Sequence, residues 1–364
     1  MSQHKYWLGF SLIPEIGPRR LQRLRESFDD LGEAWHAPET KLRSTGLEPR
    51  IVSNLIQQRA KIDLTTEMSR ISKVGARLIT LDDSSYPPFL RETSSPPIVL
   101  YVKGDFPDPL NRTLAVVGTR KATQYGKDIA FQFSRDLAYH NVVIVSGLAQ
   151  GIDIEAHKGA LDGGGYTIAV LGCGIDRVYP YENQKYASAI IKQGALISEF
   201  PIGSRPDRHH FPRRNRIISG MSLGVLIVEA PINSGALITA EIATEQGRDV
   251  FAIPGNIFQA TSHGPNRLIQ DGAKAITNVE DILEELNIVY EGVERRQQTE
   301  SIAPTTEVES SILRHMTVDP IHIDDLVRLS GLPVALVSST LTILELKGLV
   351  RAFSQMQYGL VNKI

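Results

Sequence analysis

Arginines and one aromatic side chain are concentrated in a short stretch of the chain, GSRPDRHHFPRRNRIISG, at residues 203–220. It contains five arginines against a single acid, Asp207, and Phe211 stands among them. Guanidinium groups bind phosphates through paired hydrogen bonds, and an aromatic ring between them can stack on a base. These residue types favour a ligand that carries several phosphates and unpaired bases. The alternative is a solvated charged loop, or arginines that pair with acids such as Glu199 and Glu229.

A second element with this potential is the turn that follows the apolar run LAVV and reads Gly118-Thr119-Arg120-Lys121. An apolar run that enters a glycine turn and then an amphipathic stretch is typical of a buried strand followed by a helix whose N-terminus can hold phosphate. The glycines do not follow the Gly-x-Gly-x-x-Gly spacing of dinucleotide-binding folds, and no glycine turn ends in Gly-Lys-Ser or Gly-Lys-Thr. The sequence therefore disfavours NAD and ATP, and it predicts no cofactor.

The elements that must position these segments are six short apolar runs, each typical of a strand buried on both faces of a parallel sheet. The runs are Leu114–Val117, Val142–Val145, Thr167–Leu171, Ala195–Ser198, Gly224–Val228 and Asp249–Ile253. Helical stretches between most of them predict right-handed βαβ units and an α/β fold with a doubly wound, mostly parallel sheet. In such a sheet the ligand site lies at the carboxyl ends of the strands, where both arginine-bearing segments fall. An extended, proline-rich arm at residues 82–104 is expected to lead into this sheet.

The two flanks of the sheet domain have different patterns. Residues 1–70 predict short helices after glycine–proline turns and resemble helix-hairpin-helix or SAM-like modules, with a small packing domain as the other interpretation. Residues 307–364 predict three helices and a strand–turn–strand, the winged-helix arrangement. Their five Lys and Arg against six Asp and Glu disfavour tight duplex binding and favour a protein-contact or auxiliary role. The expected domains are 1–70, 72–288 and 307–364, with a polar linker at 289–306.

Composition excludes several other classes of protein. The net charge of −2 over 364 residues means that any nucleic-acid surface must come from local clustering of cations. The single cysteine, Cys173, excludes an internal disulfide framework and cysteine-rich zinc sites. No apolar run approaches membrane-spanning length, so we expect a cytoplasmic protein without membrane contact. The adjacent His209 and His210 point apart, and we predict no metal site.

Taken together, seven motifs in this order resemble the DNA-processing protein A family, called DprA or Smf. The motifs are VVGTRKAT, VSGLAQGIDIEAHKGAL, LGCGIDRVYPYEN, SEFPIG, FPRRNRIISG, VEAPINSGALITAEIATEQGRDVFAIPG and GPNRLIQDGA. The resemblance spans roughly residues 72–276 and implies an extended Rossmann fold. It further implies a protein that binds and protects single-stranded DNA, loads the RecA recombinase onto it during natural transformation and recombination, and acts as a homodimer. Single-strand-binding protein is a further candidate partner.

The resemblance also assigns roles to individual residues. The family's Gly-Ser/Thr-Arg turn binds strand phosphates, which gives this role above all to Arg120. Asp153 is expected to orient the turn before it. The expected DNA-binding residues are Gly118, Thr119, Arg120, Lys121, Ser146, Gly147, Gly151, Arg208, Phe211, Arg213, Arg214, Asn215, Arg216, Ser234, Gly235 and Thr239.

The alternative function is a nucleotide-binding, phosphoribohydrolase-like enzyme on a related Rossmann sheet. Such enzymes resemble one another in a Pro-Gly-Gly-x-Gly-Thr-x-x-Glu turn. The corresponding stretch here, PINSGALITAE, lacks the glycine pair and places Glu241 six residues past Gly235. The sequence also shows no nucleophile–base pair and no clustered carboxylates, so we predict that the protein is not an enzyme and has no catalytic residues. Tyr179 could stack on a base or pack in its turn, and His157 is expected to make a structural hydrogen bond.

Overall fold

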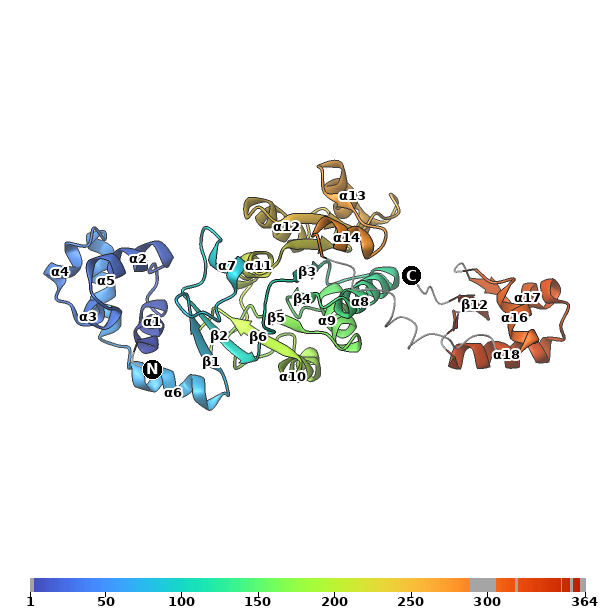
Figure 1. Cartoon of the computed structure of the whole chain (residues 1–364), viewed down its shortest axis with the longest axis horizontal. Helices are drawn as coiled ribbons and strands as arrows, with labels where there is room; N and C mark the ends of the chain where they lie inside the picture. Colours follow the sequence, from blue (N-terminus) through green and yellow to red (C-terminus); the bar gives the residue numbers. More distant parts are fainter. Residues whose placement is uncertain (1–2, 289–305, 318–319, 348, 354–355, 361–364) are drawn as a thin grey trace. The chain divides into compact units, whose positions relative to one another are not determined.

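The computed structural model describes residues 3–288, 306–317, 320–347, 349–353 and 356–360 (Figure 1). The chain divides into two compact units, residues 1–290 and 291–364. The predicted linker at 289–306 lies outside the described residues, except for Thr306. The predicted boundary near residue 71 within the first unit stays a prediction.

The first unit contains a nine-stranded sheet in the order β1-β2-β6-β5-β4-β3-β7-β8-β9. Its strands are β1 Arg77–Thr80, β2 Val99–Gly104, β3 Thr113–Val117, β4 Val143–Ser146, β5 Thr167–Val170, β6 Gly194–Ser198, β7 Gly224–Ile227, β8 Asp249–Ala252 and β9 Lys274–Ala275. The strands from β6 to β9 in this order are parallel. The six predicted strands are confirmed to within one residue at each end, as is the doubly wound, mostly parallel sheet.

The prediction of an extended arm at residues 82–104 is wrong at residues 88–91, which form the short helix α7, and over its last six residues. Residues 99–104 form β2, which pairs antiparallel with β6 and with β1. The run VLYVKG is apolar enough for a strand, but the prolines and serines before it obscured the pattern in the sequence. The sheet therefore extends two antiparallel strands beyond its parallel part.

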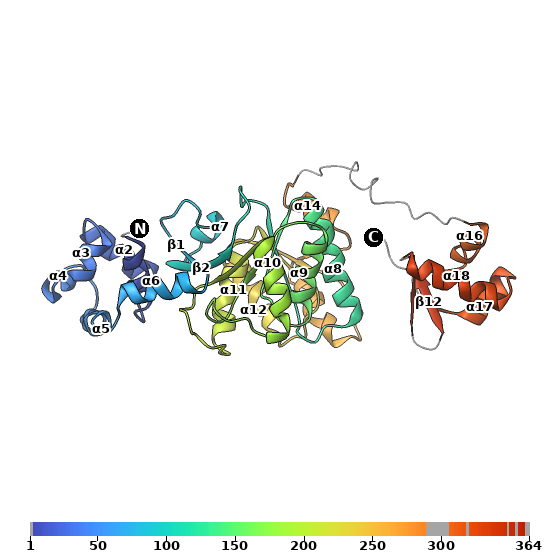
Figure 2. The same cartoon turned by 90° about the horizontal axis from the view of Figure 1, so that it is seen from below.

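Helices cover both faces of the sheet (Figures 1 and 2). One face packs against α7, α11 and α12, and the other packs against α8, α9, α10 and α14. Neighbouring residues of one strand alternate between these cores, as Val116 and Val117 of β3 do. The helices of this domain are α7 Pro88–Arg91, α8 Gln124–Tyr139, α9 Ile152–Asp162, α10 Gln184–Lys192, α11 His210–Gly220, α12 Gly235–Glu245, α13 His263–Gln270 and α14 Glu280–Glu285.

The alternative of a solvated charged loop in the 203–220 stretch is wrong for residues 210–220, which form the helix α11. Arg214, Ile217 and Ile218 are buried along one side of this helix, at the spacing of a helical face. Pro212 stands in the first turn, where its missing N–H costs no hydrogen bond. The helical pattern was not recognised in the sequence, because one of the buried positions of this face is occupied by a charged residue, Arg214.

The N-terminal helices share a hydrophobic core with the sheet. They are α1 His4–Ser11, α2 Pro18–Ser27, α3 Leu31–His36, α4 Glu39–Arg43, α5 Pro49–Arg59 and α6 Leu64–Lys73. Pro18 and Pro49 begin α2 and α5, as the glycine–proline turns predicted. One continuous cluster joins Phe10 and Leu55 of these helices to Tyr101 of β2.

The second unit has the predicted winged-helix arrangement. Its elements are α16 Glu307–Leu313, β10 Ile321–His322, α17 Ile323–Ser330, α18 Val334–Leu346, β11 Val350–Ala352 and β12 Gln357–Leu360. The three strands pair in the order β10-β12-β11, and the short β10 was not predicted. Ile312, Leu326 and Leu341, one from each helix, meet in its core. Within the described ranges no single helix is long and apolar enough to cross a membrane; only the bent pair α17 and α18 qualifies, by combined length and composition alone.

His157 of α9 makes the predicted structural hydrogen bond. The Thr167 hydroxyl donates to the Ile144 carbonyl at 2.8 Å, so it accepts from the His157 Nδ1–H, at 2.7 Å. Burial, together with the nearby Arg214, lowers the pKa of His157 from 6.5 to about 3. His157 is therefore neutral in the folded protein wherever it is neutral in the unfolded chain.

This burial predicts a pH dependence of stability. Below pH 6.5 the unfolded chain binds a proton at His157 and the folded protein does not, so stability falls as the pH drops toward 3. We expect His157→Gln to remove about 2–3 kcal/mol of the loss in unfolding free energy between pH 7 and about pH 4.5. Urea titrations of both proteins at the two pH values measure it, and equal losses would contradict this role.

Candidate nucleic-acid interface

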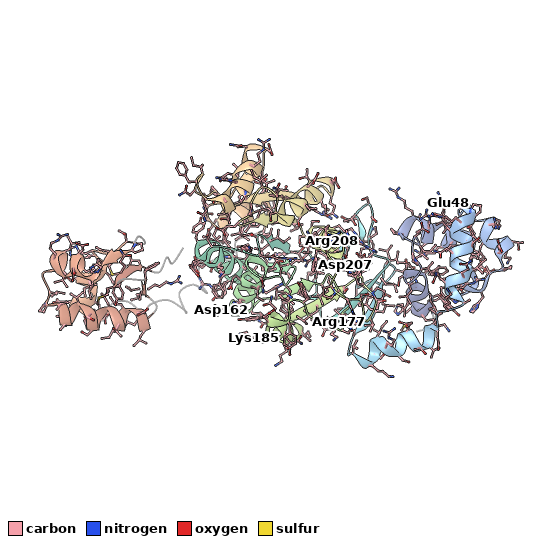
Figure 3. The ribbon with its side chains drawn as sticks, turned by 180° about the vertical axis from the view of Figure 1, so that it is seen from behind. Glu48, Asp162, Arg177, Lys185, Asp207 and Arg208 are labelled. Carbon is pink, nitrogen blue, oxygen red and sulfur yellow. The ribbon has the colours of Figure 1, made fainter. Side chains whose placement is uncertain are left out.

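A pocket of about 670 Å³ opens at the carboxyl ends of the parallel strands. The residues that line it come from the segments that follow β3, β5 and β6, as expected if ligands bind at the carboxyl ends of the strands (the strand-end rule). We call it the arginine pocket; Arg177 and Arg208 are labelled in Figure 3. Its lining residues are Arg120, Arg177, Tyr179, Arg205, Pro206, Arg208, Phe211 and Pro212.

The four arginines of the pocket have few partners within the protein. Arg120 and Arg205 are exposed and have no hydrogen bond or ion pair to the described residues. Arg208 donates to the neighbouring His209 ring at 3.2 Å, and the Nε of Arg177 lies 3.5 Å from the carboxylate of Asp176. Arg120 and Arg205 are thus without partners among the described residues, and Arg177 and Arg208 have donors left over; guanidinium groups that face one cavity in this way attract an anion with several phosphates.

Two aromatic rings form a wall of the same pocket. The ring centroids of Tyr179 and Phe211 are 5.9 Å apart, and the guanidinium of Arg120 lies 5.0 Å from the Phe211 centroid. Gly172 makes room for this arrangement, since a Cβ at this position would lie 2.8 Å from the Phe211 ring. The pocket therefore offers cations and stacking surface side by side, which suits a base and its phosphates.

Arg214 lies beneath the pocket and has a different role. It is buried, and its Nη1 donates to the Val170 carbonyl at 2.6 Å. A Cβ on Gly147 would lie 2.0 Å from Nη1, so this glycine is needed to accommodate the guanidinium. Burial lowers the pKa of Arg214 to about 10 and raises that of the buried Asp153 beside it. The Asp153 carboxylate accepts hydrogen bonds from the amides of Gly147 and Ala149, which fits its expected role in orienting the turn.

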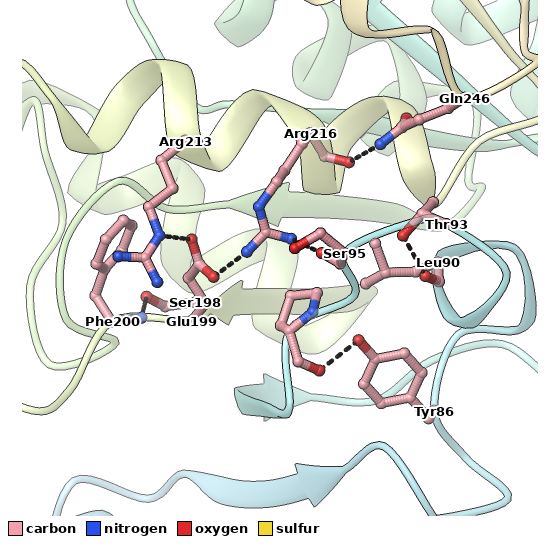
Figure 4. Close-up of polar contacts among 11 residues, drawn as sticks. Tyr86, Leu90, Thr93, Ser95, Ser198, Glu199, Phe200, Arg213, Arg216 and Gln246 are labelled. Carbon is pink, nitrogen blue, oxygen red and sulfur yellow. Dashed lines mark hydrogen bonds and ion pairs between the residues drawn. The ribbon is translucent and has the colours of Figure 1, made fainter. Parts of the chain in front are cut away.

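Arg213 and Arg216 extend from α11 to one buried carboxylate, that of Glu199 (Figure 4). The Nε of Arg213 lies 2.9 Å from Glu199, whose side chain is only 4% exposed. Arg216 pairs with the other carboxylate oxygen and donates to the Ser95 carbonyl at 2.7 Å. The alternative that arginines pair with Glu199 is thus confirmed for these two residues, and they hold α11 to the end of β6.

Glu229 occupies the helix N-terminus that follows the Gly118–Lys121 turn. Its buried carboxylate accepts hydrogen bonds from the Thr123 amide at 2.8 Å, the Thr123 hydroxyl at 2.6 Å and the Thr261 hydroxyl at 3.1 Å. A Cβ on Gly126 would lie 2.4 Å from this carboxylate. The protein's own acid therefore takes the position at α8 where a nucleotide phosphate would bind, and Arg120 faces the arginine pocket instead.

The remaining predicted residues form a rigid rim and use their side chains internally. The buried Ser146 hydroxyl donates to the Val116 carbonyl at 2.6 Å, and the buried Thr239 hydroxyl faces the Gly235 carbonyl at 3.4 Å. Ser234 caps α12, and Asn215 reaches Gly235 at 3.4 Å.

Glycines hold the turns of this rim together. Gly151 has a φ of 81°, and a Cβ there would lie 2.3 Å from the Thr119 carbonyl oxygen, so the two turns pack backbone against backbone. Gly118 faces Ile152 in the same way. Lys121 is exposed beside Arg120.

Two arginines of the pocket, Arg177 and Arg205, were not among the predicted binding residues. Arg177 follows β5 in the motif LGCGIDRVYP, so the strand-end rule could have found it. Burial raises the pKa of the Cys173 thiol to about 11, which leaves this cysteine without nucleophilic character. The described residues contain no group of three or more His, Cys, Asp or Glu that could hold a metal ion.

The contrast between the buried Arg214 and the exposed Arg208 predicts that substitution by Met destabilises the protein at the first position and has almost no effect at the second. Arg214→Met leaves the Asp153 carboxylate buried without its cation and should lower the unfolding free energy by about 3 kcal/mol. Arg208→Met is the matched control, because Arg208 lies just before α11 and its side chain is exposed. It should change the unfolding free energy by less than about 0.5 kcal/mol. Urea denaturation measures both, and equal effects would contradict the division into supporting and free arginines.

Comparison with known proteins agrees with this architecture. The chain matches the family model of DNA recombination-mediator protein A over residues 77–287 and that of the DprA winged helix domain over residues 296–354. It is 34% identical to Protein Smf of Synechocystis, with 98% of each chain covered. It is 38% identical to Protein Smf of Escherichia coli, with 87% of this chain and 86% of the relative covered.

Two solved structures share the fold. The crystal structure of DNA processing protein A from Streptococcus pneumoniae superposes with a TM-score of 0.66 at 35% identity, covering 77% of this chain and 97% of that chain. DNA processing protein A from Helicobacter pylori, described for its single-stranded DNA binding mode, superposes with a TM-score of 0.52 at 31% identity, covering 59% and 97%. The chain therefore belongs to the family of DNA recombination-mediator protein A, also called DprA or Smf.

Proposed function

We propose that this protein binds single-stranded DNA in the arginine pocket and loads the RecA recombinase onto the bound strand. The observation that carries the proposal is the pocket itself, in which four arginines, two of them without a partner among the described residues, line one cavity with Tyr179 and Phe211. The family supports a DNA-processing role in recombination, and the Helicobacter pylori relative is described with single-stranded DNA.

The shape of the pocket favours an unpaired strand over a duplex. A hollow of about 670 Å³ with aromatic rings on its wall can receive a base face, which a duplex keeps within its stack. The arginines around it bind phosphates without regard to sequence. The protein is therefore proposed to bind strands of any sequence, with affinity that falls as salt is added.

The further parts of the proposal concern activity, partners and place. We infer a non-enzymatic protein. The carboxylate of Glu229 is hydrogen-bonded at the N-terminus of α8, and Glu241 is exposed on α12 without an acid–base partner among the residues described above. This arrangement disfavours the phosphoribohydrolase-like alternative. The proposal also includes a homodimer, contacts with RecA and with single-strand-binding protein, and a cytoplasmic location.

The central test is the substitution Arg120→Ala. Loss of one phosphate contact should weaken binding of a labelled oligo-dT about tenfold and make the slope of log affinity against log salt shallower by about 0.7. Fluorescence anisotropy at several salt concentrations measures both. Arg77→Ala is the matched control, since Arg77 begins β1 at the opposite edge of the sheet and pairs with the exposed Asp105 at 2.7 Å.

The same titration separates the two functions. Duplex and free mononucleotides that fail to displace the strand support the proposal, whereas displacement by a mononucleotide would favour the enzyme alternative. Unchanged affinity and slope in a folded Arg120→Ala protein would remove Arg120 from the site. RecA loading is read from the lag before RecA's ATPase activity on strands coated with single-strand-binding protein, which the wild type should shorten and Arg120→Ala should not.

Phe211 provides a test of base stacking. Phe211→Ala should cost roughly 1–3 kcal/mol of binding free energy, whereas Phe211→Tyr keeps the ring and should bind as the wild type does. Anisotropy with oligo-dT measures the affinities, and circular dichroism shows that α11 remains folded. An alanine variant that binds normally would restrict Phe211 to packing against Gly172.

A further inference from the structure

A second basic cavity lies between α2 and the segment that connects β1 to β2. It has a volume of about 420 Å³, and we call it the α2 cleft. Three arginines line it and no acid does, although the protein as a whole carries a net charge of −2. The arginines are Arg19, Arg25 and Arg91, and Trp7, Leu21 and Ile98 are among the apolar lining residues.

The three arginines differ in how strongly the protein holds them. Arg19 is exposed and has no hydrogen bond or ion pair to the described part of the chain. Arg25 pairs with Asp82 at 2.6 Å and lies 5.2 Å from the Trp7 ring centroid. Arg91 donates to the Asp83 carbonyl at 2.6 Å and is otherwise exposed. The cleft therefore contains one free guanidinium and two that are oriented by neighbours yet still reach solvent.

The floor of the cleft is apolar. Leu21, Pro96 and Ile98 are buried beneath the arginines, and Trp7 is 4% exposed. An apolar floor under a rim of cations suits a ligand that combines a flat or sugar-like group with phosphates. A free inorganic anion would use the rim alone and leave the floor empty.

The helix α11 connects the α2 cleft with the arginine pocket. Phe211 and Pro212 at its first turn line the pocket, and Arg216 one turn further donates to the carbonyl of Ser95. Ser94 and Pro96, the neighbours of Ser95, line the cleft. With 11 residues, α11 is about 16 Å long.

Contact continues to the end of this helix. A Cβ on Gly220 would lie 2.8 Å from Leu90 and 3.0 Å from Thr93, so the last turn of α11 packs directly on the wall of the cleft. Arg213, 62% exposed, stands on α11 between the two cavities. Between the pocket and the cleft, α11 carries Arg213 and Arg216, both paired with Glu199, and Arg216 also contacts Ser95 (Figure 4).

We propose that the α2 cleft is a second binding site for the sugar-phosphate backbone of the same single strand, which reaches it from the arginine pocket along α11. The inference rests on the proposed function and adds the N-terminal helices to the DNA-binding surface. Arg19 and Arg91 bind phosphates, and the apolar floor receives a sugar or base between them.

The test compares two lengths of strand. One oligo-dT of about 6 nucleotides fills the arginine pocket alone, and one of about 30 nucleotides also reaches the cleft. The double variant Arg19→Ala with Arg91→Ala should bind the short strand like the wild type and the long strand about tenfold more weakly. Its salt slope on the long strand should be shallower by about 1.4, as expected for two lost phosphate contacts.

Two further variants keep the result unambiguous. Arg19→Ala alone removes a side chain without a partner, so a change in long-strand affinity cannot come from lost structure. Arg43→Ala with Arg50→Ala is the matched control, because both arginines are exposed on the N-terminal helices, pair with glutamates and lie outside the cleft. The control should bind both strands normally.

The outcomes distinguish this inference from the proposed function. A wild type that binds neither strand would overturn both. A wild type that binds both strands, with a double variant of equal affinity and slope, would overturn the second site alone. Equal strand affinity combined with lost RecA loading would also overturn it and assign the cleft to a protein partner.

Discussion

A charge buried in a protein needs a partner, and three buried acids determine how the cations of this sheet edge are used. Glu199 takes Arg213 and Arg216, Asp153 takes Arg214, and Glu229 takes the amide and hydroxyl of Thr123. The arginines that do not pair with these three acids form the surface of the proposed binding site. The guanidinium groups of Arg120, Arg177, Arg205 and Arg208 line one pocket, and of these only Arg177 pairs with an acid among the described residues, Asp176.

The supporting arginines are as necessary to this surface as the free ones. Glu199 lies at the end of β6 and fixes α11 through two guanidinium groups, so the first turn of α11 presents Phe211 at a constant place. Arg214 and Asp153 hold the turn at residues 147–151 from below. The pocket is thus built on rigid elements, and a flexible ligand rather than the protein bears most of the ordering entropy on binding.

The sheet, and the end of the sheet at which the arginine pocket opens, could be predicted from the sequence because both follow from local pattern. Continuous apolar runs mark parallel strands, and the strand-end rule then brings Arg120 and the 203–220 segment to one edge. Whether each arginine is buried or exposed depends on tertiary contacts, which the sequence pattern does not show. Arg208 and Arg214 look alike in sequence, and burial separates them only because Gly147 leaves space for one guanidinium. Helix α11 was missed since its buried face includes that arginine, and β2 was missed since a proline-rich segment precedes it.

The crowding of like charges in the empty pocket has a consequence for the unbound protein. Four guanidinium groups around about 670 Å³ repel one another, and few protein acids screen them there. The free state therefore holds unfavourable electrostatic energy, which small mobile anions of the solvent partly neutralise. Under the proposed function, a bound strand displaces these anions and releases the cations condensed on its own phosphates, so counterion entropy contributes to binding.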